Sequence, residues 1–167
     1  LGRLAEQKSV QLLIHAFGNL DRNATLVIAG KGHMKGALEK FTAEMGLSDK
    51  VIFTGRVPDD YLGDYFASAD VFVSPSRNEP FGLTITEALG CGTPVVATEN
   101  GATEVVKEGI ISVEHSSDAL ARGIIEALEM DNFEMSGKSW KDVAEETIEF
   151  YERVESSTSY SSNEPGW

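Results

Sequence analysis

The segment "ADVFVSPSRNEPFGLTITEALGCGTPVVAT" (residues 69–98) is organised as a strand, a loop, a helix and a second strand. Valine-containing apolar runs at 70–75 and 94–98 predict two strands, each bounded by turn residues. Between them, "LTITEALG" predicts a helix that begins at Phe81 or Gly82. A strand, a helix and a strand joined by short loops are typical of a parallel sheet that carries helices on its faces.

The same alternation runs through most of the chain. Further β-branched runs predict strands at 25–30, 50–55 and 110–114. Apolar residues at helical spacing predict helices at 10–20, 34–45, 57–69 and 120–128. The strands are mostly apolar along their length, so helices should cover both faces of the sheet. The sequence therefore predicts an α/β fold with a doubly wound, Rossmann-like parallel sheet.

Both ends of the chain depart from this alternation. The first residues, "LGR", resemble the end of a strand, and the first helix is predicted to begin near Gln7. We therefore expect the chain to be a piece of a longer protein. Apolar residues from Trp140 to Val154 predict a long closing helix over 138–154, and the Ser-rich residues 155–167 predict a flexible polar tail. Residues 1–154 are expected to form one domain.

Composition narrows the classes of function. The 167 residues carry a formal net charge of −13, which argues against general nucleic-acid binding and against a polybasic membrane patch. No apolar run approaches the roughly 20 residues that span a bilayer, and the first residues do not form a signal-peptide pattern. The single cysteine, Cys91, suits a reducing compartment, so a cytoplasmic location is expected. The three scattered histidines predict neither a metal site nor a catalytic triad.

Basic residues lie in the loops that should follow the strands. In open α/β sheets, ligands bind beyond the carboxyl ends of the strands. The loops at that edge contain the basic residues Arg3, Lys8, Lys31, Arg56 and Arg77. In so acidic a chain these cations favour a phosphate-bearing ligand. The alternative is that they are ordinary solvated residues of strand–helix turns.

Two glutamates flank the predicted helix start. Free backbone N–H groups at a helix start bind anions, and Gly82 has no Cβ to hold a phosphate away. Glu87 lies roughly 7–8 Å further along the helix axis, at a rise of about 1.5 Å per residue, which matches the span from a diphosphate to a ribose. Glu79 lies before the helix, where a sugar attached to the diphosphate would lie. The alternative makes Glu79 a loop charge and Glu87 a surface residue. We favour the ligand hypothesis because this apolar helix should be largely buried.

With these two glutamates seven residues apart, the segment resembles the E-x7-E motif of retaining glycosyltransferases of the GT-B fold, particularly glycosyltransferase family four (glycosyl transferases group one). The first segment, "GRLAEQKSVQLLIHAF" (2–17), is similar to the family's G-R-x-x-x-x-K segment. The resemblance continues through "LVIAGKGHMKGALEKFTAEMGLSDKVIFTGRVPDDYL" (26–62), "NGATEVV" (100–106) and "SWKDVAEETIEFYERV" (139–154). It covers residues 1 to about 154 and corresponds to the C-terminal, donor-binding domain of the family.

The resemblance implies catalytic roles for three charged residues. Arg3 and Lys8 would hold the donor diphosphate and stabilise the charge on the departing nucleotide. These fixed cations would replace a metal ion, since no DxD motif is apparent. Glu79 would contact hydroxyl groups of the donor sugar. Neither a metal nor a cofactor is expected, because the nucleoside diphosphate sugar is itself a substrate.

The resemblance also implies a set of donor-binding residues. They are Arg56, Val57, Phe81, Gly82, Leu83, Thr84 and Glu87. The backbone of the first two would read the base, and Glu87 would bind the ribose. The N–H groups of residues 81–83 would cradle the phosphate and the sugar.

The whole enzyme implied by the resemblance is a hexosyltransferase that moves a sugar, with retention, from a nucleoside diphosphate to an acceptor hydroxyl. The acceptor, a sugar or a lipid-linked glycan, would need an N-terminal domain that this chain lacks, so this chain alone should not transfer sugar. Peripheral membrane association of the full-length enzyme is compatible with this function. The alternatives are a phosphorylase or epimerase of the same fold, or a non-catalytic nucleotide-sugar-binding module.

The chain departs from the family pattern in two residues and one loop. Ser9 stands where the family often has Gly, and Ala102 replaces the second Gly of a common Gly-Gly pair. The loop in "EGIISVE" (108–114) is shorter than usual.

Overall fold

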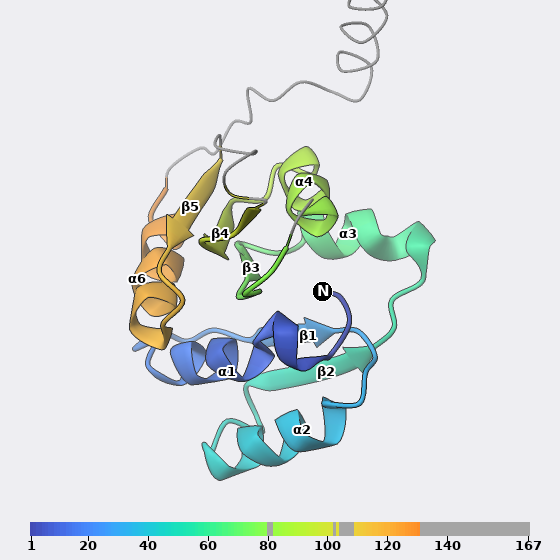
Figure 1. Cartoon of the computed structure of the whole chain (residues 1–167), viewed down its shortest axis with the longest axis vertical. Helices are drawn as coiled ribbons and strands as arrows, with labels where there is room; N and C mark the ends of the chain where they lie inside the picture. The colour runs from blue at the N-terminus through green and yellow to red at the C-terminus, as the bar shows by residue number, and fades with distance from the viewer. Residues whose placement is uncertain (80–81, 102, 104–108, 131–167) are drawn as a thin grey trace, which may run out of the picture. The chain divides into compact units, whose positions relative to one another are not determined.

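The computed structural model describes residues 1–79, 82–101, 103 and 109–130 of the chain. Strands and helices alternate through this part, as predicted (Figure 1). In chain order the elements are the 3-10 turn η1 (Glu6–Lys8), α1 (Val10–Gly18), β1 (Leu26–Ala29), α2 (Lys35–Glu44), β2 (Val51–Gly55), the 3-10 turn η2 (Asp59–Tyr61), α3 (Leu62–Ala67), β3 (Phe72–Ser74), α4 (Leu83–Gly90), β4 (Val95–Thr98), β5 (Ile110–Val113) and α6 (Ser117–Leu128). The closing helix predicted over 138–154 and the tail over 155–167 lie outside the described residues, as does Ala102.

The strands of the described residues are all parallel and form two hydrogen-bonded sheets. One sheet pairs β1 with β2, and the other has the order β3–β4–β5. In the second sheet Phe72 lies opposite Val95, which lies opposite Ile110. The prediction of an α/β fold with parallel strands and covering helices is confirmed. The sheet is divided between β1 and β3, and the amino terminus lies in that region (Figure 1).

The amino-terminal residues run alongside the carboxyl end of β1. The backbone N–H of Gly2 donates to the carbonyl of Ala29 at 2.9 Å, and that of Leu4 donates to the carbonyl of Lys31 at 2.9 Å. Both segments advance by two residues between these bonds, which is the spacing of a parallel ladder. The residues of "LGR" therefore bond as the end of a parallel strand does.

Two glycines after β1 make room for this segment. A Cβ on Gly30 would lie 1.7 Å from the carbonyl oxygen of Gly2, and one on Gly32 would lie 2.0 Å from that of Leu4. Any larger residue would collide with the neighbouring backbone. The "GKG" sequence thus has a packing role.

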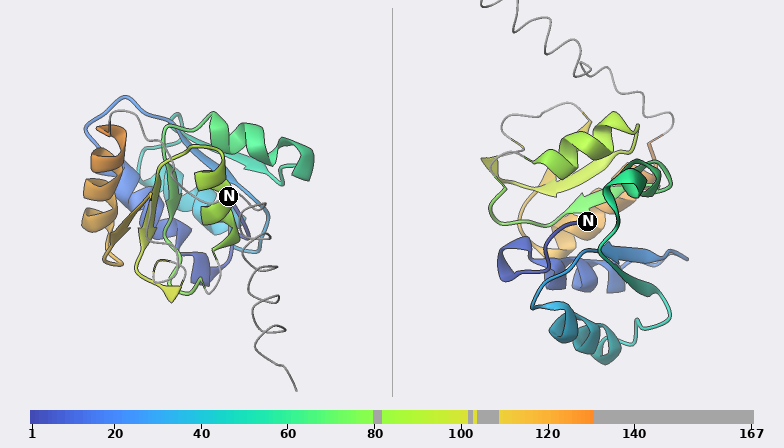
Figure 2. Two further views of the ribbon diagram at one scale, coloured as in Figure 1. Left: turned by 90° about the horizontal axis from the view of Figure 1, so that it is seen from above. Right: turned by 90° about the vertical axis from the view of Figure 1, so that its right-hand side faces the viewer.

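Helices cover both faces of the β3–β4–β5 sheet (Figure 2). On one face, Leu13 of α1 and Leu120 of α6 are buried in one cluster with Val96 of β4. On the other face, Phe66 of α3 packs edge-on against Phe72, with ring centroids 5.3 Å apart and ring planes at 84°. This geometry is a favourable one for aromatic pairs. Both helical layers expected from the apolar strands are therefore present.

The β1–β2 sheet is covered unevenly. On one face, Phe17 of α1, Ile28 of β1 and Leu38 of α2 belong to a buried cluster. Side chains alternate between the faces of a strand, so Val27 and its neighbour Ile52 lie on the other face. These two side chains are 46% and 51% exposed.

The first helix is interrupted near its start. The sequence predicts a helix from Gln7, but the chain forms a 3-10 turn that ends at Lys8, and α1 begins at Val10. The break falls at Ser9, whose φ of 48° and ψ of 35° are left-handed. This conformation costs a residue with a Cβ roughly 1–2 kcal/mol, which glycine avoids. It gives a physical reason for a glycine at this position.

Candidate functional site

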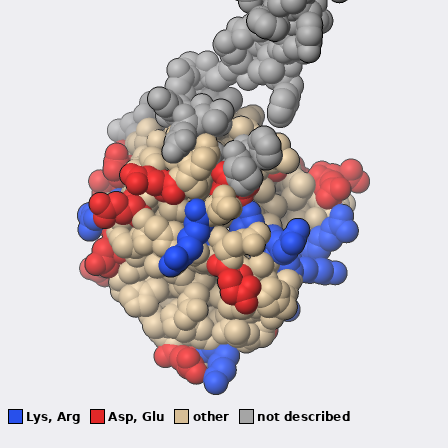
Figure 3. Space-filling model, viewed as in Figure 1, with Lys and Arg blue, Asp and Glu red and all other residues tan. Residues whose placement is uncertain are grey.

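The loops that follow parallel strands open on one edge of each sheet. The cations predicted for the ligand lie in these loops or in the amino-terminal segment beside β1. In the face of the molecule seen in Figure 1, Lys and Arg side chains lie toward the middle and the right, with groups of Asp and Glu around them (Figure 3). This face therefore carries local positive charge, although the whole chain is acidic.

Lys8 and Glu79 come into contact at this edge. Lys8 is the last residue of η1, and its Nζ donates to Oε2 of Glu79, which lies in the loop after β3. The two side chains are 26% and 16% exposed, so the ion pair is better shielded from water than a surface pair. The backbones of the two segments also meet, because the N–H of Arg77 donates to the carbonyl of Gln7 at 3.1 Å. The structure thus joins two of the three predicted catalytic residues.

A polar cluster that the sequence analysis did not single out holds the loop of Glu79. The carbonyl of Ser76 accepts hydrogen bonds from Thr98 Oγ1 at 2.8 Å and from Asn100 Nδ2 at 3.1 Å. The same amide donates to the carbonyl of Thr98 at 2.7 Å. These bonds tie the loop after β3 to the end of β4. Sequence reasoning could have found Ser76, Thr98 and Asn100, because they lie at or just beyond the ends of predicted strands.

The start of α4 has the open geometry expected of an anion site. Gly82 is the N-cap residue, is buried and has a left-handed φ of 61°, which favours glycine. Among the described residues, no side chain makes a capping hydrogen bond to this end. By helix geometry, the N–H groups of Leu83 and Thr84 have no partner within the helix. Phe81, which was predicted to share in the cradle, lies outside the described residues.

Glu87 is exposed, so the expectation that α4 buries it was wrong. The buried residues of α4 are Ile85, Ala88 and Leu89, whose spacing defines the face that packs on the sheet. Leu83 lies one turn before Glu87, off this face, and is 62% exposed. The apolar composition of the helix therefore did not determine the environment of its carboxylate. Among the described residues, no side-chain hydrogen bond or ion pair joins the Glu87 carboxylate to another predicted site residue.

A cavity of about 250 Å³ connects Arg3 with the predicted base-reading backbone. Its lining includes Arg3, Lys31, Arg56 and Val57. The guanidinium of Arg56 lies 3.7 Å from the Asp59 carboxylate, in an exposed pair that leaves the cation hydrated. Three cations thus border one small cavity. Lys31 is one of the basic loop residues of the sequence, but the predicted site does not include it.

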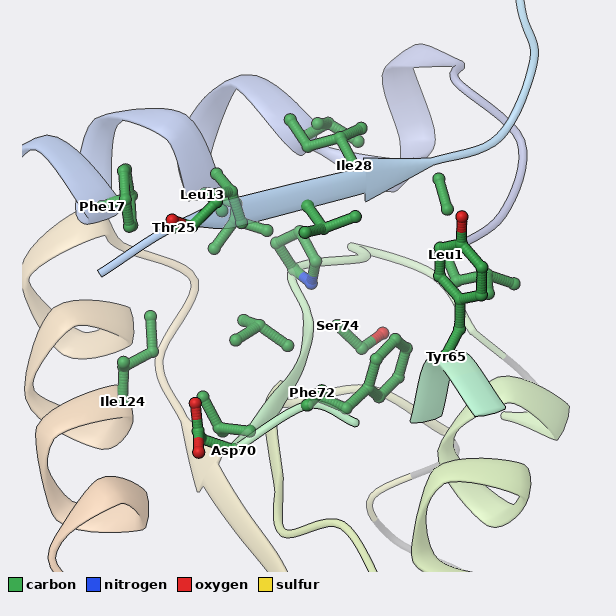
Figure 4. A pocket seen from close by; sticks show the side chains of 18 of the residues that line it. Leu1, Leu13, Phe17, Thr25, Ile28, Tyr65, Asp70, Phe72, Ser74 and Ile124 are labelled. Atoms are coloured by element: carbon green, nitrogen blue, oxygen red, sulfur yellow. The ribbon is translucent and has the colours of Figure 1, made fainter. Parts of the chain in front are cut away.

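A larger cavity of about 970 Å³ lies between β1 and β3 (Figure 4). Arg3, Lys8 and Thr84 contribute to its lining. The two predicted diphosphate-binding cations and the second residue of α4 therefore border the same cavity. The remaining predicted residues of the described chain, Glu79, Gly82, Leu83 and Glu87, do not line it.

Two groups near the amino terminus have lowered pKa values. Burial, and then the charge of Lys8, lower the pKa of the Leu1 ammonium from 8.0 to about 6. A hydrogen bond with the ring of His33 lowers the pKa of the exposed Glu6 carboxyl. Another contact that the sequence did not predict places His115 Nε2 3.1 Å from Oγ of Ser9, so the strained turn after Lys8 is hydrogen-bonded to the loop that follows β5.

Neither a membrane-spanning helix nor a metal-binding cluster is found in the described residues. No helix there is long and apolar enough to cross a membrane. No group of three or more His, Cys, Asp or Glu side chains in that part is placed to hold a metal ion.

Comparison with protein sequences gives a match to known families. Residues 1–150 match the family described as glycosyl transferases group 1. The chain is 38% identical over 168 aligned positions to an uncharacterized glycosyltransferase of Methanocaldococcus jannaschii, covering 90% of this chain and 43% of that protein. It is also 34% identical over 158 residues to a GDP-mannose-dependent alpha-(1-6)-phosphatidylinositol monomannoside mannosyltransferase of Mycobacterium tuberculosis. That match covers 84% of this chain and 41% of the mannosyltransferase. The chain spans less than half the length of either relative.

Solved structures share the fold. HepE of Anabaena, in complex with UDP and glucose, gives a TM-score of 0.67 at 29% identity over 77% of this chain and 38% of that one. Sucrose-phosphate synthase of Thermosynechococcus elongatus gives a TM-score of 0.72 at 25% identity. The match covers 94% of this chain and 45% of that one. These likenesses agree with a Rossmann-like domain. Because the family match extends over residues 1–150 of the 167, the chain belongs to the glycosyl transferases group 1 family.

Proposed function

We propose that the chain is the donor-binding, C-terminal domain of a retaining GT-B glycosyltransferase of family four. The full-length enzyme would transfer a hexose from a nucleoside diphosphate to an acceptor hydroxyl. The contact between Lys8 and Glu79 is the observation that carries this proposal, because a cation and a carboxylate 71 positions apart meet at the ligand edge. The relatives support the donor class, since one is named for its dependence on GDP-mannose and HepE was solved with UDP and glucose.

In the proposed reaction, the bond from the sugar to the diphosphate breaks and negative charge develops on the leaving nucleotide. Fixed positive groups stabilise such charge without reorganisation. Arg3 and Lys8 would supply them, assisted by the N–H groups of residues 81–83 and by Thr84 at the start of α4. Lys8 would divide its charge between the phosphate and Glu79. Glu79, oriented by Lys8, would accept hydrogen bonds from hydroxyls of the donor sugar.

The nucleoside would extend from the diphosphate in the direction opposite to the donor sugar. Glu87 has an exposed carboxylate, which would accept hydrogen bonds from the ribose. The base would lie against the backbone of Arg56 and Val57, which border the smaller cavity together with Arg3. We propose metal-independent chemistry with no cofactor, because the cations of the chain would perform the role of a metal.

The proposed domain comprises residues 1–154, with a closing helix near 138–154 and a tail over 155–167. The acceptor would bind an N-terminal domain outside this chain. One domain edge cannot bring donor and acceptor together, and proximity lowers a reaction barrier by up to about 7–11 kcal/mol. The chain alone is therefore expected to bind donor without transferring sugar. We propose a cytoplasmic enzyme, with peripheral membrane association where the acceptor is lipid-linked.

Titration calorimetry with UDP, UMP, GDP and GMP tests donor binding. Loss of a charge-assisted contact costs about 1.5–3 kcal/mol, so one diphosphate should bind about 10- to 150-fold more tightly than its monophosphate. Lys8→Met should remove most of this difference. Lys40→Met is the matched control, because Lys40 lies in α2 with its side chain 79% exposed. Equal binding of diphosphates and monophosphates would contradict the proposal.

The two glutamates should have separable effects. Glu87→Ala should weaken free nucleoside diphosphate, since the ribose is common to all ligands. Glu79→Ala should weaken only the nucleotide sugar, because Glu79 would contact the sugar, at the opposite end of the ligand from the ribose. Equal weakening of free nucleotide by both changes would contradict the extended pose.

Turnover assays on the full-length enzyme distinguish the alternatives. Sugar transfer to an acceptor hydroxyl is expected there and not with this chain alone. Binding without turnover would identify a non-catalytic module. Consumption of donor in phosphorolysis or epimerisation, without transfer, would identify the other enzyme class. Transfer by this chain at the full-length rate would show that it holds a complete active site.

A further inference from the structure

One peptide unit in the loop after β3 is hydrogen-bonded on both sides. Its carbonyl, that of Ser76, accepts from Thr98 Oγ1 at 2.8 Å and from Asn100 Nδ2 at 3.1 Å. Its N–H, that of Arg77, donates to the carbonyl of Gln7 at 3.1 Å. The C=O and N–H of a planar trans peptide point in opposite directions. The unit is therefore held between the end of β4 and the turn η1.

This peptide unit is the last buried point of the chain before Glu79. Ser76 is 2% exposed, whereas residues 77–78, which connect it to Glu79, are exposed. On the η1 side, Gln7 immediately precedes Lys8, which pairs with the Glu79 carboxylate. The peptide unit thus ties the loop of Glu79 to the turn that carries its ion-pair partner.

Thr98 holds this peptide unit from a rigid position. It is the last residue of the central strand β4 and lies opposite Val113 of β5 in the parallel register. A β-branched side chain on a strand has few accessible rotamers, so its hydroxyl has a well-defined direction. Thr98 is 0% exposed, so a bound donor would not touch it. Any effect of Thr98 on a ligand must therefore pass through Ser76.

We propose that Thr98 is a positioning residue for the donor sugar. Its hydroxyl fixes the peptide unit between Ser76 and Arg77, and through it the Glu79 carboxylate beside Lys8. This inference rests on the proposed function, in which Glu79 accepts hydrogen bonds from hydroxyls of the donor sugar. It adds that the affinity for the sugar depends on a buried hydroxyl in another strand.

Free nucleoside diphosphate should respond much less to this hydroxyl. Its proposed ligand Lys8 lies in η1, which is closed by a hydrogen bond of its own, from the N–H of Lys8 to the carbonyl of Ala5 at 3.0 Å. Loss of the Thr98 hydroxyl should therefore displace Glu79 more than Lys8. The nucleotide sugar and the free nucleotide should consequently differ in their response.

The test uses a matched pair of buried threonines. Thr98→Val keeps the shape of the side chain and removes the hydroxyl. Thr93→Val is the control, because Thr93 lies just before β4, is 2% exposed and donates from Oγ1 to the carbonyl of Phe66 at 2.7 Å. Each change removes one buried hydrogen bond to a backbone carbonyl, so the losses of stability should be similar. The loop of Glu79 is bonded to the first threonine and not to the second.

Titration calorimetry of the chain with UDP-glucose, GDP-mannose, UDP and GDP measures the effect on binding. For the sugar nucleotide that the unchanged chain binds more tightly, Thr98→Val should raise the Kd by about 5- to 10-fold, and that of its free diphosphate by less than about twofold. Thr93→Val should change neither Kd by more than about twofold. Thr98→Ser, which restores a hydroxyl, should recover most of the affinity. Thr98→Cys, a weaker donor of similar size, provides the same comparison if the valine variant does not fold.

A double variant tests whether Thr98 acts through Glu79. In a Glu79→Ala chain, Thr98→Val should have no further effect on the sugar nucleotide. Additive losses, or equal losses from Thr98→Val and Thr93→Val, would overturn the inference. Thr98→Val without effect, beside an effective Glu79→Ala, would overturn this inference alone. Unchanged sugar-nucleotide binding by Glu79→Ala would contradict the proposed role of Glu79, and this inference with it.

Discussion

Lys8 and Glu79 form an ion pair that joins the turn before α1 to the loop after β3. Each side chain is less than one-third exposed, so each would lose a largely shielded partner on mutation of the other. We expect a double-mutant cycle of Lys8→Met and Glu79→Gln to give a coupling energy of about 1–3 kcal/mol in urea unfolding. The control cycle uses Lys40 and Glu44, an exposed pair on α2 at 3.7 Å, for which about 0.3–0.5 kcal/mol is expected. Equal coupling in the two cycles would show that shielding adds nothing.

Ser9 combines backbone strain with a hydrogen bond to His115. Ser9→Ala keeps the left-handed strain and loses the bond, so it should lower the free energy of unfolding by about 0.5–1.5 kcal/mol. Ser9→Gly loses the bond but relieves the strain, and should be about 1 kcal/mol more stable than the alanine variant. Chemical denaturation of the three proteins measures both differences. If the alanine variant were as stable as the glycine variant, the left-handed conformation at residue 9 would carry no strain that glycine relieves.

Gly30 and Gly32 should tolerate no side chain, because the backbone of the amino-terminal segment occupies the space of their Cβ atoms. Gly30→Ala and Gly32→Ala are each expected to lower the free energy of unfolding by about 1–3 kcal/mol and to speed exchange of the Leu4 amide. Gly36→Ala is the control, since a Cβ there meets nothing within 4 Å and the residue lies in α2. That change should leave stability equal or raise it by up to about 1 kcal/mol. Similar losses at all three glycines would exclude the steric explanation.

The Leu1 ammonium should make stability depend on pH. Its pKa is lowered from 8.0 to about 6 in the folded chain, so between these values the unfolded chain holds more protons. Stability should therefore rise as the pH increases from 6 to 8, by on the order of 2–3 kcal/mol at about 1.4 kcal/mol per pH unit. Urea unfolding of the chain with a free amino group measures this slope. The amino-terminally acetylated chain should lack it, and an equal slope after acetylation would assign the effect to other groups.

The alternation of elements was predictable because it depends on local pattern. The run at 94–98 contains β4, and the segment after Ser116 forms α6, because β-branched runs and helical spacing act within a few residues. The positions of Lys31, Arg56 and Arg77 in loops that follow strands were also predictable from local pattern. The contact between Lys8 and Glu79 was not, because it depends on how distant loops meet.

Two features needed the three-dimensional structure for a physical reason. Whether Glu87 is exposed depends on which face of α4 packs on the sheet, and the composition of the helix does not specify that face. The conformation of Ser9 has no signal in its own residue type, since serine is rarely left-handed. The division of the sheet likewise depends on pairing between strands rather than on any single strand.

The packing of α1 against α6 also determines when the fold can be completed during synthesis. Leu13 and Ala16 share a buried cluster with Leu120 and Ile124, which leave the ribosome roughly one hundred residues later. At about 5–20 residues per second, α1 therefore waits for several seconds with one apolar face uncovered. Limited proteolysis of ribosome-bound chains should show cleavage within α1 until α6 has emerged. A premature stop codon before Ser117 would make that exposure permanent, and the truncated product would be a substrate for chaperones and proteases from the moment of its release.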